Sequence, residues 1–271
     1  MFKKILIYSG WSLLTIMLGA YFFFASKLRS EGKEKEICRA INVTLLDSAQ
    51  NRFVNKNEVI DIIEGFTGYT IGKKIDDINL ANIELLLDKR SAIKSAQASI
   101  SRNGILEIDI TQRRPLLRIQ TSEGGFYIDE TGYIFPLVES FSSYVPVITG
   151  YIPLDLDTSH RGKIGDKEGN WIDKLIAFGE FINENEFWNA MIEQIYIAKN
   201  GDIILCPKVG DLEIIFGDFN NMEEKFTKLL AFYKNVAPHE GWGKYSKVNL
   251  KYKDQIVCKL KKKKDNKAKT I

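Results

Sequence analysis

Residues 96–110 read AQASISRNGILEIDI, and this stretch decides the fold of the first part of the chain. Apolar and polar residues alternate on both sides of Asn103-Gly104, which is the pattern of strands with one buried face. The apolar positions of the two runs are Ala96, Ala98, Ile100, Leu106, Ile108 and Ile110. Because Asn-Gly is the strongest short signal for a tight turn between strands, the stretch predicts a β-hairpin.

The segment before the hairpin adds one strand and two helices. Residues 41–45 alternate in the same way and predict a strand. A helix is predicted after Asn55, because Glu58 follows at the spacing of a capping box and apolar residues recur at helical spacing as far as Phe66. A second helix is predicted after Asn79. This order gives a small sheet with two helices on one face, and its outer strands are available to partners.

Strands dominate the chain beyond Gln112-Arg113-Arg114-Pro115, where proline would interrupt a central strand and indicates a domain boundary. The later elements expected are hairpins at 126–136 and 192–206, a helix at 171–182, and strands at 116–119, 212–216, 247–252 and 256–260. Another helix is expected after Asn221, where Glu224 repeats the capping-box spacing. The sequence therefore predicts an α+β fold, with a β-α-α-β-β domain at 41–114 and a strand-rich mixed α/β domain at 115–260 that ends in an edge strand.

Residues 5–25 carry no charged side chain. About 20 apolar residues wound as a helix match the hydrocarbon core of a bilayer, so a membrane-spanning helix is predicted between a short tip at 1–4 and a linker at 26–40. A cleaved signal peptide is the alternative. Its apolar region would be only ~7–15 residues long, and aromatic residues at 21–24 occupy the place where a cleavage site wants small ones.

The orientation of this helix does not follow from its flanking charges, because lysines lie on both sides. Long domains translocate largely regardless of charge, which favours a cytoplasmic N-terminus and domains outside the cytoplasm. Lysines at the start of residues 261–271 predict a solvated basic tail. The net charge of +3 argues against nucleic acid as a partner, since a basic stripe would be expected for it.

Residues that could carry out catalysis or bind metal lack the partners that such chemistry needs. His160 and His239 have no second ligand at metal spacing. Ser91 and Lys94 match a Ser-x-x-Lys pattern, but its companion motifs are missing. The three cysteines, Cys38, Cys206 and Cys258, are far apart and are expected to be buried or half-buried hydrophobes. The sequence thus predicts no enzyme, cofactor, metal site or small-molecule substrate.

The order of these segments resembles that of the FtsQ/DivIB cell-division proteins. In that family the small unit is a POTRA domain, and the junction after it has the form Glu/Gln-Arg-x-Pro, as residues 112–115 do. Residues 126–136 resemble the family's aspartate-x-x-glycine segment, and 144–150 resemble its proline-to-glycine segment. Residues 248–252 resemble its strand of valine, aspartate, leucine, arginine and tyrosine.

The resemblance implies a non-catalytic, single-pass scaffold of the bacterial divisome. It would sit at the septum in the cell inner membrane, with its domains in the periplasm. Its partners would be FtsB/FtsL-type membrane proteins, bound by strand addition to the late strands, while the POTRA domain would serve other divisome proteins. The residues implied in partner binding are Lys251, Tyr252, Ile256, Val257, Cys258, Lys259 and Leu260.

Two departures from the family pattern affect this assignment. Asn249 replaces the aspartate, and Lys251 replaces an arginine whose bidentate contact lysine cannot make. Lysines along an edge strand also protect it from pairing, so the same residues fit protection as well as recognition.

Two other functions compete with the scaffold. The alternative is a membrane-anchored POTRA chaperone for exported or outer-membrane polypeptides, although such units usually recur in tandem and the sequence predicts one. An anchored cell-wall hydrolase is disfavoured, because no catalytic set accompanies the fold.

Overall fold

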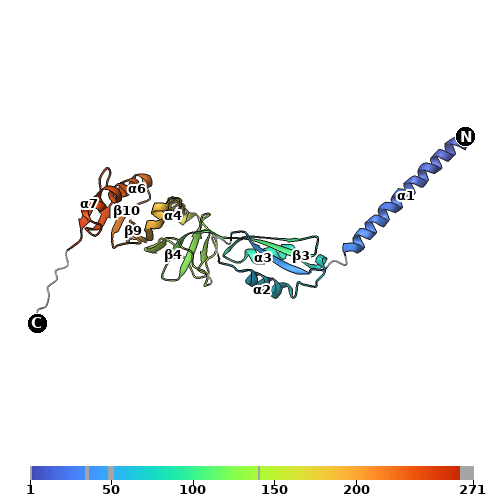
Figure 1. The fold of residues 1–271 in the computed structure, drawn as a ribbon, viewed down its shortest axis with the longest axis horizontal. Helices are drawn as coiled ribbons and strands as arrows, with labels where there is room; N and C mark the ends of the chain where they lie inside the picture. The colour runs from blue at the N-terminus through green and yellow to red at the C-terminus, as the bar shows by residue number, and fades with distance from the viewer. Residues whose placement is uncertain (1, 34–36, 48–51, 140, 263–271) are drawn as a thin grey trace. The chain divides into compact units, whose positions relative to one another are not determined.

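A computed structural model describes residues 2–33, 37–47, 52–139 and 141–262. Side chains of two helices lie outside that description at residues 2–10, 12, 28–33 and 166–169. The predicted tip, linker and basic tail are therefore described only in part. The chain divides into two compact units, residues 1–112 and 113–271, whose elements Figure 1 labels.

The first unit contains the predicted strand, helix, helix, strand, strand order after an N-terminal helix. Its elements are α1 (Phe2–Lys33), β1 (Ala40–Leu45), α2 (Lys56–Thr67), η1 (Ile75–Asp77), α3 (Leu80–Asp88), β2 (Ile93–Ile100) and β3 (Ile105–Gln112). Among the described residues the three strands form one sheet in the order β1-β3-β2. β1 runs parallel to β3, whereas β2 pairs with β3 as the antiparallel hairpin that the sequence predicts.

Side-chain caps explain where the two helices of this unit begin. Asn55 accepts a hydrogen bond from the backbone N–H of Glu58 at 2.8 Å. Asn79 does the same for Asn82 at 3.0 Å. Each cap satisfies an N–H that the first turn of a helix leaves unpaired. The helices then bury one apolar side, including Ile63 of α2 and Leu87 of α3.

The second unit is a mixed sheet with helices. Its elements are β4 (Pro115–Gln120), β5 (Gly125–Asp129), β6 (Ile134–Pro136), β7 (Val147–Gly150), α4 (Asp166–Glu184), α5 (Glu186–Met191), β8 (Ile192–Ile197), β9 (Ile203–Pro207), β10 (Glu213–Gly217), α6 (Met222–Ala231), the π-helix η2 (Phe232–Val236), α7 (Ala237–Glu240), β11 (Tyr245–Asn249) and β12 (Val257–Leu260). Within the described chain, nine strands pair in the order β12-β11-β10-β9-β8-β7-β4-β5-β6. β12 therefore ends the described sheet on one side and β6 on the other.

The core of the second unit lies between this sheet and α4 and α6. Phe178 of α4, Phe216 of β10 and Phe226 of α6 are buried together, with ring centroids 5.0–5.7 Å apart. At Gly179, a Cβ atom would lie 2.8 Å from Cδ1 of Leu117 in β4. The glycine thus lets α4 approach the sheet closely.

The junction sequence contacts the first hairpin of the second unit. Arg113 donates a hydrogen bond to the buried carboxylate of Asp129 at 2.9 Å, and its guanidinium carbon lies 3.4 Å from the ring centroid of Tyr133. Asp129 also accepts from the N–H groups of Thr131 and Tyr133. The junction at 112–115 and the segment at 126–136 are therefore in contact, because Arg113 binds residues of the turn that follows β5.

The predicted α+β class is confirmed, with its small β-α-α-β-β unit and strand-rich second unit. The capping box predicted at Asn221 is wrong. Its φ of 51° is left-handed and its side chain makes no cap hydrogen bond, although α6 still begins at the next residue.

The membrane-spanning helix predicted at 5–25 is not confirmed. No helix in the described part of the chain is both long and apolar enough to cross a membrane. Part of the predicted span, the side chains of residues 5–10 and 12, lies outside that description.

Candidate partner-binding edge

β12 is the outermost strand on its side of the described sheet. It pairs antiparallel with β11, with Val257 opposite Asn249 and Leu260 opposite Tyr245. The hairpin register shifts once, between Tyr245 and Lys247. A strand in this position has backbone N–H and C=O groups on its outer side with no neighbouring strand, and such an edge can accept a strand from another chain.

The side chains of the edge divide between the two faces of the sheet. Ile256 and Cys258 are half-buried and pack against the core. Val257, Lys259 and Leu260 are exposed. Burial raises the pKa of the Cys258 thiol, which favours its protonated form at neutral pH. Of the strand residues predicted to meet a partner, Cys258 thus belongs mainly to the fold.

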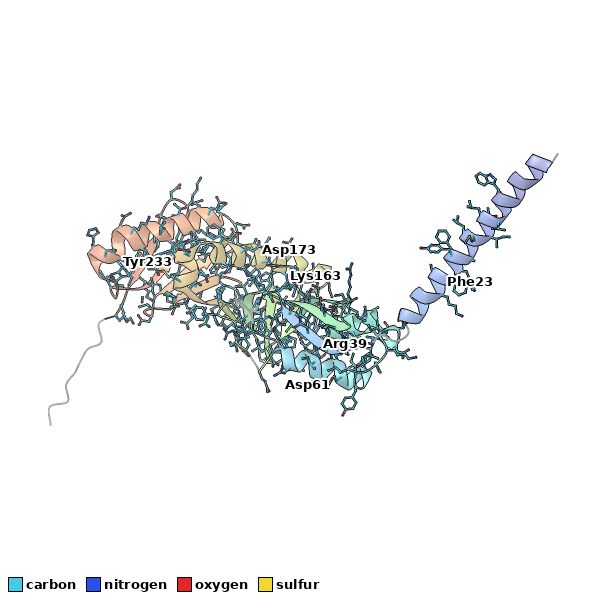
Figure 2. All side chains as sticks on the ribbon, turned by 45° about the vertical axis from the view of Figure 1, so that its right-hand side comes forward. Phe23, Arg39, Asp61, Lys163, Asp173 and Tyr233 are labelled. Atoms are coloured by element: carbon cyan, nitrogen blue, oxygen red, sulfur yellow. The ribbon has the colours of Figure 1, made fainter. Side chains whose placement is uncertain are left out.

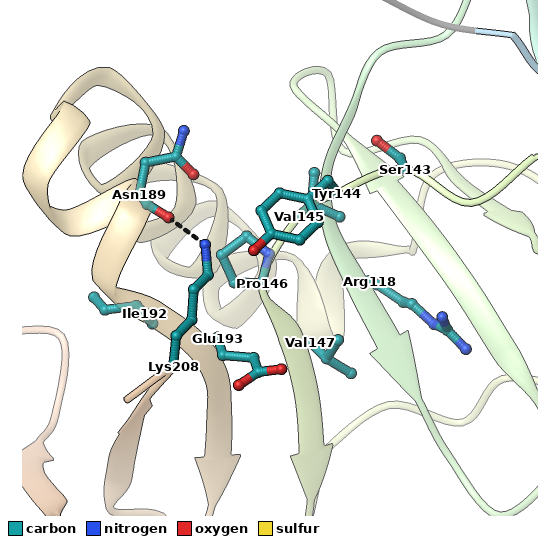
Figure 3. A pocket seen from close by; sticks show the side chains of 10 residues that line it. All are labelled: Arg118, Ser143, Tyr144, Val145, Pro146, Val147, Asn189, Ile192, Glu193 and Lys208. Carbon is teal, nitrogen blue, oxygen red and sulfur yellow. Dashed lines mark hydrogen bonds between the residues drawn. The ribbon is translucent and has the colours of Figure 1, made fainter. Parts of the chain in front are cut away.

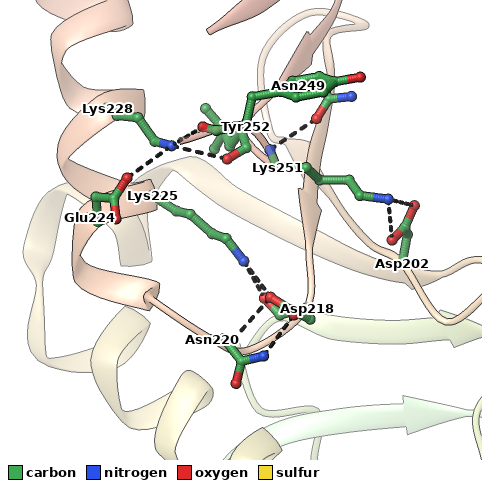
Figure 4. A network of polar contacts seen from close by, with 10 residues as sticks. Asp202, Asp218, Asn220, Glu224, Lys225, Lys228, Asn249, Lys251 and Tyr252 are labelled. Atoms are coloured by element: carbon green, nitrogen blue, oxygen red, sulfur yellow. Dashed lines mark hydrogen bonds and ion pairs between the residues drawn. The ribbon is translucent and has the colours of Figure 1, made fainter. Parts of the chain in front are cut away.

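The turn before β12 is held by two lysines from opposite directions (Figure 4). Lys228 of α6 donates to the backbone oxygen of Tyr252 at 2.6 Å and to that of Leu250 at 3.2 Å. Lys251 donates to both carboxylate oxygens of Asp202, at 2.8 and 2.9 Å. The Asn249 side chain accepts from the N–H of Lys251 at 3.0 Å. These contacts fix the position of Tyr252, whose ring remains exposed.

Lys251 is therefore engaged within its own chain. Its methylene chain crosses Gly217, where a Cβ atom would lie 2.8 Å from Cγ of the lysine. The hydrogen bond to Asp202 raises the pKa of Lys251. Burial works to raise the pKa of Asp202, but hydrogen bonds from Lys251 and Asn200 outweigh it and lower that pKa below its usual value. Lys251, which the sequence predicts as a partner contact, thus makes its contacts to Asp202 and Gly217 of its own chain.

Two further lysines beside the edge also have acidic partners. Lys247 pairs with Glu213 of the neighbouring strand β10. Lys261 pairs with Asp211 at 2.6 Å, and that hydrogen bond lowers the pKa of the carboxyl. Among the described side chains, Lys259 has no ion pair, so its charge is available on the exposed face.

Sequence reasoning missed Lys228, Asp202 and Gly217, which position the turn. Asp202 and Gly217 each lie beside a strand end, where polar residues and glycine are common turn formers. That signal indicates a turn and carries no information about contact with Lys251.

A separate site, a cavity, lies where β7 begins between β4 and β8. This cavity of about 150 Å³ is lined by Arg118, Ser143, Tyr144, Val145, Pro146, Val147, Asn189, Ile192, Glu193 and Lys208. Figure 3 shows the Lys208 ammonium between the backbone oxygen of Asn189, at 3.0 Å, and the ring of Tyr144, 4.3 Å from its centroid. The Lys208 ammonium is therefore already engaged by the Asn189 oxygen and the Tyr144 ring. The described residues contain no cluster of His, Cys, Asp and Glu that could hold a metal ion.

The chain combines a three-stranded β-α-α-β-β unit with a mixed sheet whose last described strand is open, and this combination defines a two-part class of protein suited to binding other proteins. Residues 36–111 match a POTRA-like domain model. Residues 114–259, more than half of the chain, match the model for FtsQ/DivIB, C-terminal related. The chain belongs to this FtsQ/DivIB-related family, and the predicted resemblance is confirmed. It matches none of the curated proteins with which it was compared.

Family membership indicates a cell-division protein with a POTRA-like domain. Members of the family, like POTRA domains in general, are typically non-catalytic and act through protein–protein interactions.

Proposed function

We propose that this chain is a non-catalytic scaffold of the bacterial division septum that recruits or regulates FtsB/FtsL-type partners by accepting a partner strand at β12. The supporting observation is the position of β12 at the end of the described sheet, with Val257 and Leu260 exposed. The segment that matches the family ends at residue 259 and so includes all of β12 except Leu260. Strand addition obtains affinity from backbone hydrogen bonds and specificity from alternate side chains.

The faces of β12 define what the partner strand should look like. Leu260 shares a face with half-buried Cys258 but is itself exposed. An apolar partner residue beside Leu260 would extend the core outward. Lys259 points to the opposite face, where an acidic partner residue would complement its charge. The partner strand should therefore alternate between apolar and acidic or polar residues.

The lysines near the edge fall into two groups, those with an ion pair and those without one. Lys247, Lys251 and Lys261 each have a carboxylate partner, so their charge is largely compensated. Lys253, Lys259 and Lys262 are exposed and have no ion pair among the described side chains. These lysines would favour an acidic partner strand over an uncharged or basic one.

The strand-addition proposal is tested by measuring capture of an FtsB/FtsL-type partner by the full chain. Val257→Asp and Tyr252→Asp should each weaken binding by about tenfold or more, because they place a charge at the centre of the contact. Tyr144→Asp is the matched control, since Tyr144 is an exposed aromatic residue of the same unit away from β12. Unchanged capture by both edge variants, with native circular dichroism, would rule out this site.

We further propose that residues 5–25 of α1 anchor the chain in the cell inner membrane, with the N-terminus in the cytoplasm and residues 41–260 outside it. This segment has no charged residue, and its large side chains from Trp11 to Phe24 that the structure describes are 51–71% exposed. Such a surface is stable only when covered by lipid or protein. The full chain should stay in the membrane fraction after alkaline carbonate extraction, and release into the supernatant would contradict the anchor.

A further inference from the structure

An exposed apolar patch lies at one end of the β-α-α-β-β unit. It consists of Phe66 at the end of α2, Tyr69 and Ile71 in the following loop, and Ile37 just before β1. Tyr69 is 85% exposed, so its side chain makes almost no contact with the rest of the protein. We call these four residues the basal patch. Exposed apolar side chains gathered on one loop and its neighbours indicate a contact with protein or membrane.

The loop that carries the basal patch is firmly built. Gly72 donates to the backbone oxygen of Cys38 at 2.7 Å, and Cys38 donates to that of Lys73 at 2.8 Å. Between the two exposed residues of the loop, Thr70 is fully buried and its hydroxyl lies 2.7 Å from that of Thr67. Because Thr70 points inward, Tyr69 and Ile71 on either side of it are held facing outward.

The chain itself keeps the basal patch near the end of α1. Residues 34–36 separate Lys33, the last residue of α1, from Ile37. Four Cα-to-Cα steps span at most about 14 Å even when fully extended. Ile37 also forms a bridge with Lys74, at the end of the same loop. Ile37 is therefore within about 14 Å of the distal end of α1, which itself lies eight residues, or about 12 Å of helix, beyond the proposed membrane span.

Basic side chains accompany the patch. Arg39 (Figure 2) follows Ile37 by two residues, and its N–H bonds to Gly104 in the β-hairpin turn that also carries exposed Arg102. Exposed Lys74 closes the loop, whereas Lys73 is half-buried and its ammonium donates to the backbone oxygen of Thr67. Asp76 and Asp77 follow in η1 and reduce this positive charge without cancelling it. Exposed aromatic and aliphatic groups with surrounding lysine and arginine suit the interface of an anionic bilayer.

We propose that the basal patch rests on the outer surface of the bilayer that holds α1, with Tyr69 and Ile71 among the headgroups and the basic side chains on anionic lipid. This rests on the proposed anchor. The contact would restrict the motion of the first unit relative to the membrane plane and so define the height at which its edges meet other proteins.

The test places a fluorescent label at single positions of the full chain in lipid vesicles. Cys206→Ser and Cys258→Ser leave Cys38, which is 1% exposed and shielded from labelling. Tyr69→Cys, Phe23→Cys and Tyr144→Cys are then labelled separately with nitrobenzoxadiazole. Phe23 reports on the anchor, and Tyr144, at 81% exposed, matches Tyr69 in the other unit. The vesicles contain phosphatidylcholine, phosphatidylglycerol and a lipid with a doxyl quencher.

The proposal expects strong loss of fluorescence at Phe23 and Tyr69 and little at Tyr144. Lys74→Glu with Arg39→Glu should reduce the loss at Tyr69 in anionic vesicles and leave Phe23 unchanged. Loss at Phe23, with Tyr69 no more quenched than Tyr144, would overturn the basal contact while leaving the anchor intact, and would assign the patch to a protein partner. Fluorescence unchanged at both Phe23 and Tyr69 would overturn both proposals.

Discussion

Lys251 performs two tasks with two parts of its side chain. The ammonium group binds Asp202, and the methylene chain covers Gly217. Long basic side chains commonly bury their stems in this way while the charged end stays in water. The lysine thereby joins the turn before β12 to the ends of β9 and β10.

Gly217 is required by both its backbone and its neighbour. Its φ of +86° disfavours any residue with a Cβ, and that atom would also meet Lys251. Gly217→Ala should lower the free energy of unfolding by about 1–2 kcal/mol from the backbone alone, and by more from the displaced lysine. Denaturant unfolding measures the change.

Gly210→Ala is the control for this substitution. Gly210 has a similar φ of +88° but no atom within 4 Å of a built Cβ. Combining each change with Lys251→Ala should relieve part of the loss at Gly217 and none at Gly210. Equal losses for the two alanine variants would contradict the proposed role of Lys251.

The Lys251–Asp202 pair makes stability depend on pH at both ends of the scale. Asp202 has a lowered pKa in the folded state, so its contribution is complete above the unfolded value of about 3.9 and is lost as pH falls through the folded pKa. Lys251 has a raised pKa, so its contribution is complete below about 10.4 and is lost as pH rises through the folded pKa.

The difference in unfolding free energy between the natural chain and Lys251→Met should therefore be constant from about pH 5 to pH 9 and shrink outside that window. Methionine keeps most of the contact with Gly217. Because the pair is partly exposed, the plateau should not exceed about 1 kcal/mol. A difference that grows below pH 4 would show that the ion pair is not its source.

Individual contacts of the edge could not be predicted from the sequence. Lys251 and Asp202 are 49 residues apart, and only the packing of β11 beside β10 and β9 brings them together. The sequence indicated an edge strand at 256–260 but assigned all five residues to the partner contact, without separating half-buried Ile256 and Cys258 from the exposed residues. The edge strand was thus predictable, whereas the burial of its side chains and its supporting contacts depend on tertiary structure.

Helix ends show how far local sequence determines an element. Asn55 and Asn79 act as caps because each needs only the next three residues to do so. Asn221 has the same spacing to Glu224 but adopts a left-handed backbone. There Lys225 binds the side chain and backbone oxygen of Asp218, at 2.6 and 2.8 Å, which shapes the entry to α6 in place of a cap.

Two glycines three residues apart in and after α2 should respond to alanine with opposite signs. Gly65 is inside the helix with no atom within 4 Å of a built Cβ, so Gly65→Ala should stabilise the chain by about 0.5–1 kcal/mol. Gly68 ends the helix at φ 59° and ψ 155°, a region almost restricted to glycine, so Gly68→Ala should cost about 1–3 kcal/mol. Denaturant midpoints of both variants give the comparison, and changes of the same sign would refute the assignment.

The order of elements along the chain was predictable because each has its own periodicity and turn signals. The arrangement of the nine described strands was not, since β7 inserts between β4 and β8 and β11 pairs with β10 in parallel. These neighbours are far apart in sequence, and nothing local specifies them. The short α5 and the π-helix η2 also lack a periodic pattern of sufficient length.

The parallel pairing of β10 with β11 has a consequence for how the protein is made. Residues 218–244, which contain α6, η2 and α7, lie between β10 and β11 in the chain. Of the strands that the structure describes, β12 is the last to leave the ribosome. A chain whose translation stops before residue 245 leaves β10, with buried Ile214 and Phe216, as the outermost strand. Such a product would offer proteases and chaperones an apolar edge, and under the proposed function only molecules synthesised through β12 would carry the docking strand.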